Sequence, residues 1–340
     1  MPLAQLPLDR DVHVIADWFE FYVLNSEYTS ANFHDIQRMW DRRRNAEDAT
    51  PEGRSEDSPM EDGDEQFLEE VLTEIRTRVQ FLGDAYPFDF SDSEEALILK
   101  SKPRVGHVVY LFCLLLSNVD NSEIFELDRF SYKLDNNVRD LFQACATWAA
   151  AKIVNGSACS FGFPRPDGTG FLEKLRQVYA IVGEGQVRDH ALPGVSSSPK
   201  DEGIDVIAWA HRADAAPGRH YVLGQVATGR NWPDKSVVEY IKPFHENWFS
   251  NSPASHPTPA LFIPRCIDQI GDATLVQQIH ILTKRYGDVY YRYLMPQLAD
   301  RGFELAQTEK QYSIERTGDF AEIQSWVADT IVRMRKVETA

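Results

Sequence analysis

Two polar residues interrupt two predicted strands in the second half of the chain. Asp205 follows a glycine near the start of the apolar run 204–209, and Gln225 lies within the apolar run 220–227. A carboxylate at the start of a buried strand has to be paired, hydrated or bound to a metal, because burying an unpaired charge is costly. The amide oxygen of Gln225 could coordinate the same cation as Asp205, and oxygen ligands of this kind suit Mg²⁺. The pattern therefore predicts a site for Mg²⁺ or Mn²⁺.

The residues around Asp205 resemble the core of a nuclease family. The chain reads Asp-Glu-Gly-Ile-Asp-Val-Ile-Ala over 201–208 and, after a hairpin loop, Val-Leu-Gly-Gln-Val-Ala over 222–227. This pairing is similar to that of the Mrr-like restriction endonucleases in the PD-(D/E)XK nuclease superfamily, and the resemblance covers about residues 165–265. It implies a restriction-endonuclease-like mixed sheet flanked by helices. It also implies Mg²⁺-dependent hydrolysis of phosphodiester bonds in DNA.

The resemblance assigns roles to individual side chains. In that family an acidic residue on the preceding helix also contributes to the site, and Glu173 is the matching residue in the helix predicted over 169–181. Asp205, Glu173 and Gln225 would then be the metal ligands. Gln225 could alternatively position the nucleophile.

One position departs from the family pattern. The catalytic lysine expected two residues after Gln225 corresponds to Ala227, which can neither donate a proton nor stabilise developing charge. Lys235, in the first turn of the next predicted helix, is the preferred replacement, with Arg230 and Lys242 as alternatives. Two functions stay open: a DNA endonuclease of a bacterial restriction or anti-phage defence system, or a catalytically inactive nuclease-fold module that binds a partner ATPase, an effector or nucleic acid.

The elements that carry these residues alternate between helix and strand. Apolar periodicity in the second half predicts helices over 169–181, 231–248, 289–298 and 320–334, and strands over 204–209, 220–227, 260–263 and 303–305. Such alternation is typical of an α/β domain in which helices cover a mixed sheet. We therefore expect this nuclease-like domain to span residues 156–340.

The first 155 residues have helical periodicity and few strand signals. Apolar residues recur at steps of three and four over 11–25, 67–81, 105–117 and 142–153. The glycine- and proline-rich stretch 155–170 follows, as a boundary between domains would. The pattern predicts an all-helical domain over 1–155, through which the protein would bind a partner protein or a second copy of itself.

The negative charge is concentrated in one segment. The chain has 35 Lys and Arg against 52 Asp and Glu, a net charge of −17, yet residues 151–340 carry a net charge of only −1. Twelve acids and one base lie within 45–75. We expect a disordered acidic loop over 45–66, with an acidic lid over a basic groove as the alternative. The acidity therefore does not exclude DNA, but it predicts weak non-specific affinity for nucleic acid.

Composition limits the remaining possibilities. A hydrophobic content of 43% indicates a folded protein, and the longest apolar stretch, 105–116, is too short to span a bilayer. The N-terminus lacks the basic start and apolar middle of a signal peptide, so we expect a cytoplasmic protein. The best basic and aromatic cluster for nucleic acid lies over 284–293, although aromatic residues of this kind are more often core.

Overall fold

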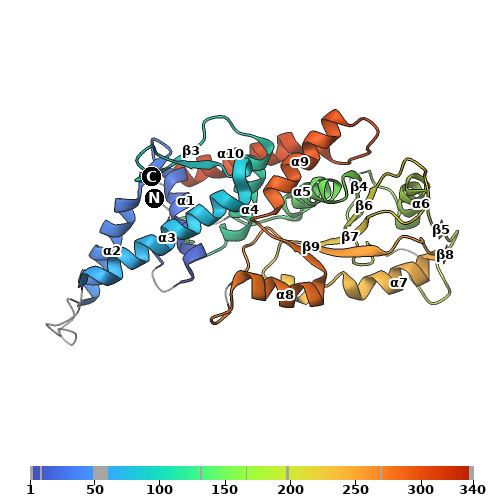
Figure 1. The fold of residues 1–340 in the computed structure, drawn as a ribbon, viewed down its shortest axis with the longest axis horizontal. Coiled ribbons are helices and arrows are strands. Elements are labelled where there is room, and N and C mark those ends of the chain that lie inside the picture. The colour runs from blue at the N-terminus through green and yellow to red at the C-terminus, as the bar shows by residue number, and fades with distance from the viewer. Residues whose placement is uncertain are drawn as a thin grey trace. The chain divides into compact units, whose positions relative to one another are not determined.

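The computed structural model describes residues 3–7, 10–48, 60–130, 132–165, 167–196, 199–268 and 270–336 (Figure 1). It divides into two compact units, one of Met1–Lys133 with Gln324–Ala340 and the other of Leu134–Ile323. The division falls before residue 155, because helix α5 (Asn136–Val154) packs against the strands of the second unit. No helix in the described ranges is long and apolar enough to cross a membrane.

The first unit contains three helices where the sequence predicts them, α1 (Val12–Asn25), α3 (Met60–Leu82) and α4 (Val105–Asn118). It also contains α2 (Phe33–Asp48) and most of α10 (Phe320–Lys336), whereas the helix predicted over 142–153 lies within α5 of the second unit. Helix α4 is central, because its residues are buried on every side. Of the predicted acidic loop 45–66, both ends are helical, in α2 and α3, and residues 49–59 lie outside the described ranges.

The sequence predicts an all-helical first domain, but the first unit also contains strands. Strands β1 (Ser30–Asn32), β3 (Ala96–Leu99) and β2 (Phe88–Phe90) form a small antiparallel sheet in that order. Each strand has only three or four residues. Runs this short carry no usable alternation of apolar and polar residues, so periodicity could not reveal them.

A buried ionic network joins the helices of the first unit. The Arg78 guanidinium in α3 is fully buried, and its Nη1 lies 2.8 Å from Asp17 Oδ1 and 2.8 Å from Glu20 Oε1 in α1. The hydroxyls of Tyr86 and Tyr110 donate hydrogen bonds to Glu20 at 2.7 and 2.8 Å. Arg78 therefore supplies positive charge to two buried carboxylates.

The second unit is built around a five-stranded mixed sheet. Its order is β10 (Asp288–Tyr290), β9 (Pro257–Phe262), β7 (Tyr221–Val226), β6 (Val206–Ala210) and β4 (Gly156–Ser160). Strands β4, β6 and β7 pair antiparallel, and β7, β9 and β10 pair parallel. The predicted α/β class with a mixed sheet is confirmed, and so are the strands expected near 204–209, 220–227 and 260–263.

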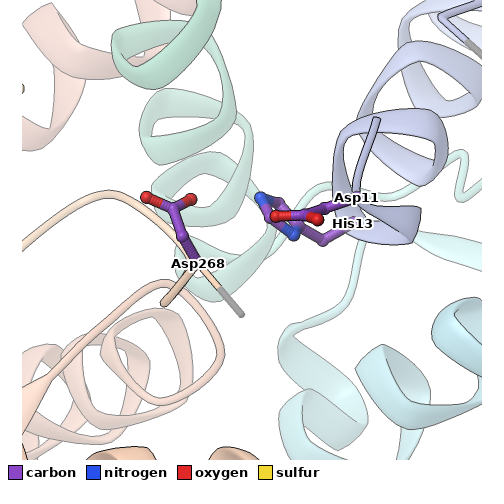
Figure 2. A group of neighbouring side chains, drawn as sticks. All are labelled: Asp11, His13 and Asp268. Carbon is purple, nitrogen blue, oxygen red and sulfur yellow. The ribbon is translucent and has the colours of Figure 1, made fainter. Parts of the chain in front are cut away.

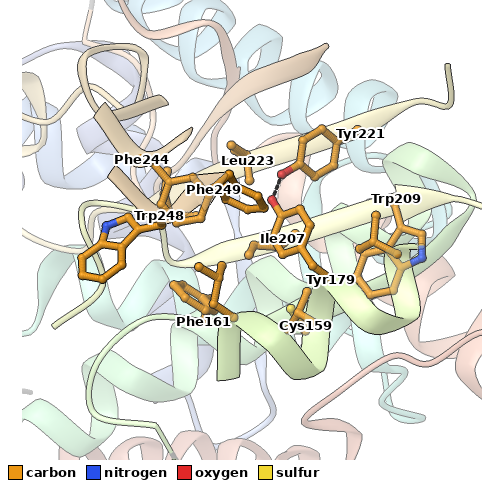
Figure 3. Packing of buried hydrophobic residues seen from close by; sticks show 14 of the residues in the cluster. Cys159, Phe161, Tyr179, Ile207, Trp209, Tyr221, Leu223, Phe244, Trp248 and Phe249 are labelled. Atoms are coloured by element: carbon orange, nitrogen blue, oxygen red, sulfur yellow. Dashed lines mark hydrogen bonds between the residues drawn. The ribbon is translucent and has the colours of Figure 1, made fainter. Parts of the chain in front are cut away.

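Helices cover both faces of this sheet. Helices α6 (Phe171–Val182) and α7 (Val238–Trp248) pack on one face, where Figure 3 shows the hydrogen-bonded hydroxyls of Tyr179 and Tyr221 inside an apolar cluster. Helix α8 (Leu275–Tyr286) packs against β9 and β10. Helix α5 packs against β4, β6 and β7, with α9 (Met295–Thr308) against it. A short pair of strands, β5 (Gln186–Val187) and β8 (Phe249–Asn251), completes the unit.

Two elements near the C-terminus differ from the prediction. Residues 289–298 begin as strand β10 and become helical only at Met295, and residues 303–305 belong to α9 instead of forming a strand. Phe303 and Leu305 flank Glu304, and three residues are too few to separate the alternation of a strand from part of a helix. The sequence prediction also missed β4 and α8.

Candidate functional site

A pocket of about 540 Å³ opens where β6 begins and β7 ends. It is lined by Asn136, Arg139, Asp140, Gln143, Phe163, Pro164, Lys200, Asp201, Asp205, Val226 and Thr228. All of these residues belong to the second unit. Of the four side chains that the sequence predicts for the site, only Asp205 is among them.

Backbone and side-chain hydrogen bonds hold Asp205 in place. Its backbone N–H donates to Gly224 O at 2.8 Å, and its carbonyl accepts from the N–H groups of Phe161 and Gly162 at 2.7 and 3.0 Å. Its carboxylate Oδ2 accepts from the Val226 N–H at 2.8 Å. The carboxylate is therefore fixed relative to both neighbouring strands, β4 and β7, before any ligand binds.

The surroundings of Asp205 disfavour its charged form. Burial of the carboxyl, together with the nearby charges of Asp201 and Asp140, raises the pKa of Asp205 to about 7, although the Val226 N–H and the charge of Lys235 oppose the shift. The residue keeps some exposure to the pocket. A cation bound there would stabilise the ionised form, because a nearby positive charge lowers the pKa of a carboxyl.

Gln143 supplies an amide oxygen beside Asp205. Its Nε2 donates a hydrogen bond to Ser160 Oγ on β4, which orients the amide. A Cβ built on Gly162 would lie 2.2 Å from Gln143 Oε1 and 2.6 Å from Asp205 Oδ1. Both oxygens therefore lie against Gly162, and only glycine leaves room for them. The amide oxygen near Asp205 comes from α5 and not from β7.

Helix α5 also brings a second carboxylate to the pocket. Asp140 lines the pocket one turn before Gln143, and its Oδ2 lies 2.7 Å from Arg316 Nη2. Asp140, Gln143 and Thr147 follow a spacing of three and four along a helix whose other buried residues are mostly apolar. This polar stripe is the signal in the sequence that could have identified α5 as a wall of the site.

The other predicted metal ligands do not line the pocket. Glu173 is exposed on α6, where its Oε1 accepts a 3.5 Å hydrogen bond from Gln177. Gln225 is 5% exposed, and its Oε1 is buried without a hydrogen-bond partner. Because side chains alternate along a strand, Gln225 points to the face of β7 opposite Val226, together with Leu223 of the apolar cluster. The structure thus separates both residues from the pocket around Asp205.

The position of the expected lysine also faces away from the pocket. Ala227 packs in an apolar cluster with Trp232 and Leu261, so an alanine there satisfies the core. Lys235 is exposed and does not line the pocket, although its charge is near enough to lower the pKa of Asp205. The alternatives are also outside the lining: Arg230 is exposed, and Lys242 pairs with Glu246 along α7 at 3.7 Å.

Arg139 and Lys200 are the cationic side chains of the pocket lining. Arg139 Nη1 donates to Thr228 Oγ1 at 3.3 Å, and Lys200 is exposed at the pocket. The basic and aromatic cluster 284–293 offers less than the sequence suggests, because Tyr291, Arg292 and Tyr293 are buried. Positive charge for an anionic ligand is therefore available at the pocket itself.

A second group of side chains that could bind a metal ion is not assigned a function. Figure 2 draws Asp11 and His13, from the start of the chain's first helix, and Asp268, which belongs to the other unit. Because these residues come from different units, we assign no metal site to them. Among the described residues of the second unit, no three His, Cys, Asp or Glu side chains bring their ligand atoms within 4.8 Å of one another.

Comparisons with known proteins leave the site to be interpreted from its own chemistry. Family models, curated proteins and solved structures give no match to the chain. Carboxylate and amide oxygens are ligands that Mg²⁺ accepts, so Asp205 and Gln143 fit such an ion. An arginine and a lysine at the same pocket fit an anionic ligand, and phosphate is one of the anions, with carboxylate, that arginine binds in bidentate fashion.

Two buried glutamines distinguish this pocket from the site predicted by sequence. We expect Gln143→Met to weaken the binding of Mg²⁺ or Mn²⁺ by at least about tenfold, since it removes an oxygen beside Asp205. We expect Gln225→Met to leave the metal affinity within about twofold and to cost no stability, because the oxygen it removes is buried without a partner. Calorimetric metal titration and thermal unfolding of both variants test this. The reverse order of effects would restore Gln225 to the site.

Proposed function

We propose that the second unit hydrolyses phosphodiester bonds in DNA with the help of Mg²⁺ or Mn²⁺, with the pocket around Asp205 as the active site. The observation that carries the proposal is one pocket that combines a carboxylate and an amide oxygen at Gly162 with the cationic side chains Arg139 and Lys200. The resemblance of residues 165–265 to Mrr-like restriction endonucleases supports the same reaction. So does the position of Asp205 at the start of β6 in a mixed sheet.

Asp205 and Gln143 would hold the cation, with Asp140 as a further acid on the wall of the pocket. When bound, such an ion supplies Lewis acidity and lowers the pKa of an attacking water. The Val226 N–H keeps the Asp205 carboxylate oriented. Arg139 donates a hydrogen bond to Thr228 through Nη1, and its guanidinium can also bind a non-bridging phosphate oxygen.

Lys200 supplies a second positive charge on a more exposed side chain. It can offset the charge that develops on the phosphate in the transition state, which is the role that the sequence assigns to Lys235. A lysine outside β7 would explain why the strand contributes Val226 to the pocket and the loop after it contributes Thr228. The lysine missing from position 227 would then have its function performed from the loop before β6.

The biological setting is part of the proposal. The family resemblance favours a cytoplasmic nuclease of a bacterial restriction or anti-phage defence system. The first unit, with its own buried core, would bind a partner protein or a second copy of the chain. Co-purification of the full chain with its neighbouring gene products tests that arrangement.

The reaction is tested with plasmid DNA in Mg²⁺, in Mn²⁺ and in EDTA. We expect the wild-type chain to cleave only with a divalent cation and Asp205→Ala to be inactive. Asp189→Asn, which changes an exposed aspartate outside the pocket lining, serves as the control and should cleave normally. Cleavage that persists in Asp205→Ala would overturn the assigned site. An inactive wild type in the presence of its partners would favour the non-catalytic binding module instead.

A further inference from the structure

Phe163 is an aromatic side chain that the fold leaves exposed at the pocket. Its exposed fraction is 55%, whereas nearby Phe161 and Phe171 are buried in the core. It lines the pocket together with Pro164. Lys200 Nζ lies over this ring, 6.0 Å from its centroid, so an aromatic ring and a positive charge are adjacent at the pocket. Neither side chain is needed to fill the core of the second unit.

The pocket and its rim have the parts that bind one nucleotide. A volume of about 540 Å³ lies within the range of ligand pockets, roughly 300 to 1,000 Å³. An exposed aromatic ring stacks on any base, because every base has a π-face. Arg139 and Lys200 can bind the attached phosphate, and Asp205 lies in the same pocket. These groups place base recognition at Phe163 and the reacting phosphate between the cations and the carboxylate.

A base that is paired in a duplex could not stack on Phe163 while its phosphate contacts Arg139 and Lys200. Its faces are covered by neighbouring base pairs, and it reaches a protein pocket only after it is unstacked and rotated out of the helix, which costs a few kcal/mol.

We propose that the pocket binds an unpaired nucleotide of single-stranded DNA, with the base stacked on Phe163 and its phosphate held by Arg139 and Lys200. This inference rests on the proposed nuclease function, whose substrate class it narrows to single-stranded DNA or to unpaired regions within a duplex. Stacking does not read base identity, so the pocket accepts all four bases with modest preferences.

The test measures binding without cleavage. The full chain carrying Asp205→Asn is titrated in EDTA with a single-stranded oligonucleotide that contains 2-aminopurine, and with the same oligonucleotide in a duplex. We expect the fluorescence of 2-aminopurine to be quenched only in the single strand. We also expect the single strand to bind more tightly than the duplex. Adding Phe163→Leu should weaken single-strand binding by about tenfold, whereas Phe163→Trp should retain it. Tyr28→Leu, which changes an exposed tyrosine of the first unit, is the matched control.

Two results would overturn the inference: equal affinity for single strand and duplex, or unchanged single-strand affinity in Phe163→Leu. Circular dichroism of each variant confirms that the fold is retained, which we expect because Phe163 is largely exposed. Binding is measured in EDTA with a variant that does not cleave, so it does not depend on hydrolysis. Failure of the stacking site and failure of the nuclease reaction are therefore separate outcomes.

Discussion

Asp205→Asn is expected to lower cleavage by more than about 100-fold and, at the same time, to stabilise the metal-free second unit at pH 8 by roughly 3 kcal/mol. The gain arises because the pKa of Asp205 is raised to about 7, so the folded state holds a charge at pH 8 that its surroundings disfavour. Asparagine is neutral and its Oδ1 can still accept the hydrogen bond from the Val226 N–H. The full pKa shift of Asp205 corresponds to a larger gain in unfolding free energy. Solvent in the open pocket screens the carboxylate and reduces that gain.

The sign of the pH dependence follows from the two pKa values of this carboxyl. Below about pH 4 both the folded and the unfolded state are protonated at Asp205, so the wild type and the variant should differ little. Between pH 4 and pH 7 the unfolded chain loses its proton first, and the wild type loses stability as the pH rises. Above pH 7 the difference should stay constant.

Hydrogen exchange of the β6 and β7 amides in EDTA measures this difference within the second unit. Added Mg²⁺ should slow exchange in the wild type and not in Asp205→Asn, since only the wild type binds the ion tightly. The control Asp189→Asn should follow the wild type at every pH. Equal protection of the wild type and Asp205→Asn at pH 8 would contradict the strained carboxyl and, with it, the pocket as a cation site.

Arg78→Met is expected to destabilise the first unit by about 3 to 5 kcal/mol. The substitution keeps most of the volume of the side chain but removes the positive charge that lies 2.8 Å from both Asp17 and Glu20. The Tyr86 and Tyr110 hydroxyls would still donate hydrogen bonds to Glu20, which cannot replace a full positive charge. Unfolding should therefore begin in the first unit.

Arg76 offers a matched control two residues earlier in α3. It pairs with Glu69 and Glu94 at 3.1 and 3.4 Å, but its side chain is 47% exposed. Arg76→Met should change the unfolding free energy by less than about 1 kcal/mol, because exposed ion pairs contribute little. Urea unfolding of both variants, followed by hydrogen exchange of α1 and α3, makes the comparison. Similar small effects for both would mean that the buried network contributes no more than a surface pair.

Many helices and strands of the second unit could be predicted from the sequence alone, because their apolar residues recur with a helical or strand period. The strand runs 204–209 and 220–227 are apolar enough to be recognised, and Asp205 stands out as the charge at the start of one of them. The short strands β1, β2 and β3 of the first unit could not be predicted. Strand β1 pairs with β3, more than 60 positions away, and strands of three or four residues show no period.

The side chains that surround Asp205 in the pocket could not be predicted from the spacing of residues in the sequence. Gln225 follows Gly224, which pairs with Val206 across the hairpin, so the sequence favours Gln225 as a neighbour of Asp205. The alternation of side chains along the strand turns it to the other face of β7. Gln143 and Asp140 lie more than 60 residues before Asp205, on a helix that the sequence analysis places in another domain. Only the packing of α5 against β4, β6 and β7 brings them to Asp205, because contacts between distant segments are decided by how helices cover a sheet and leave no local pattern.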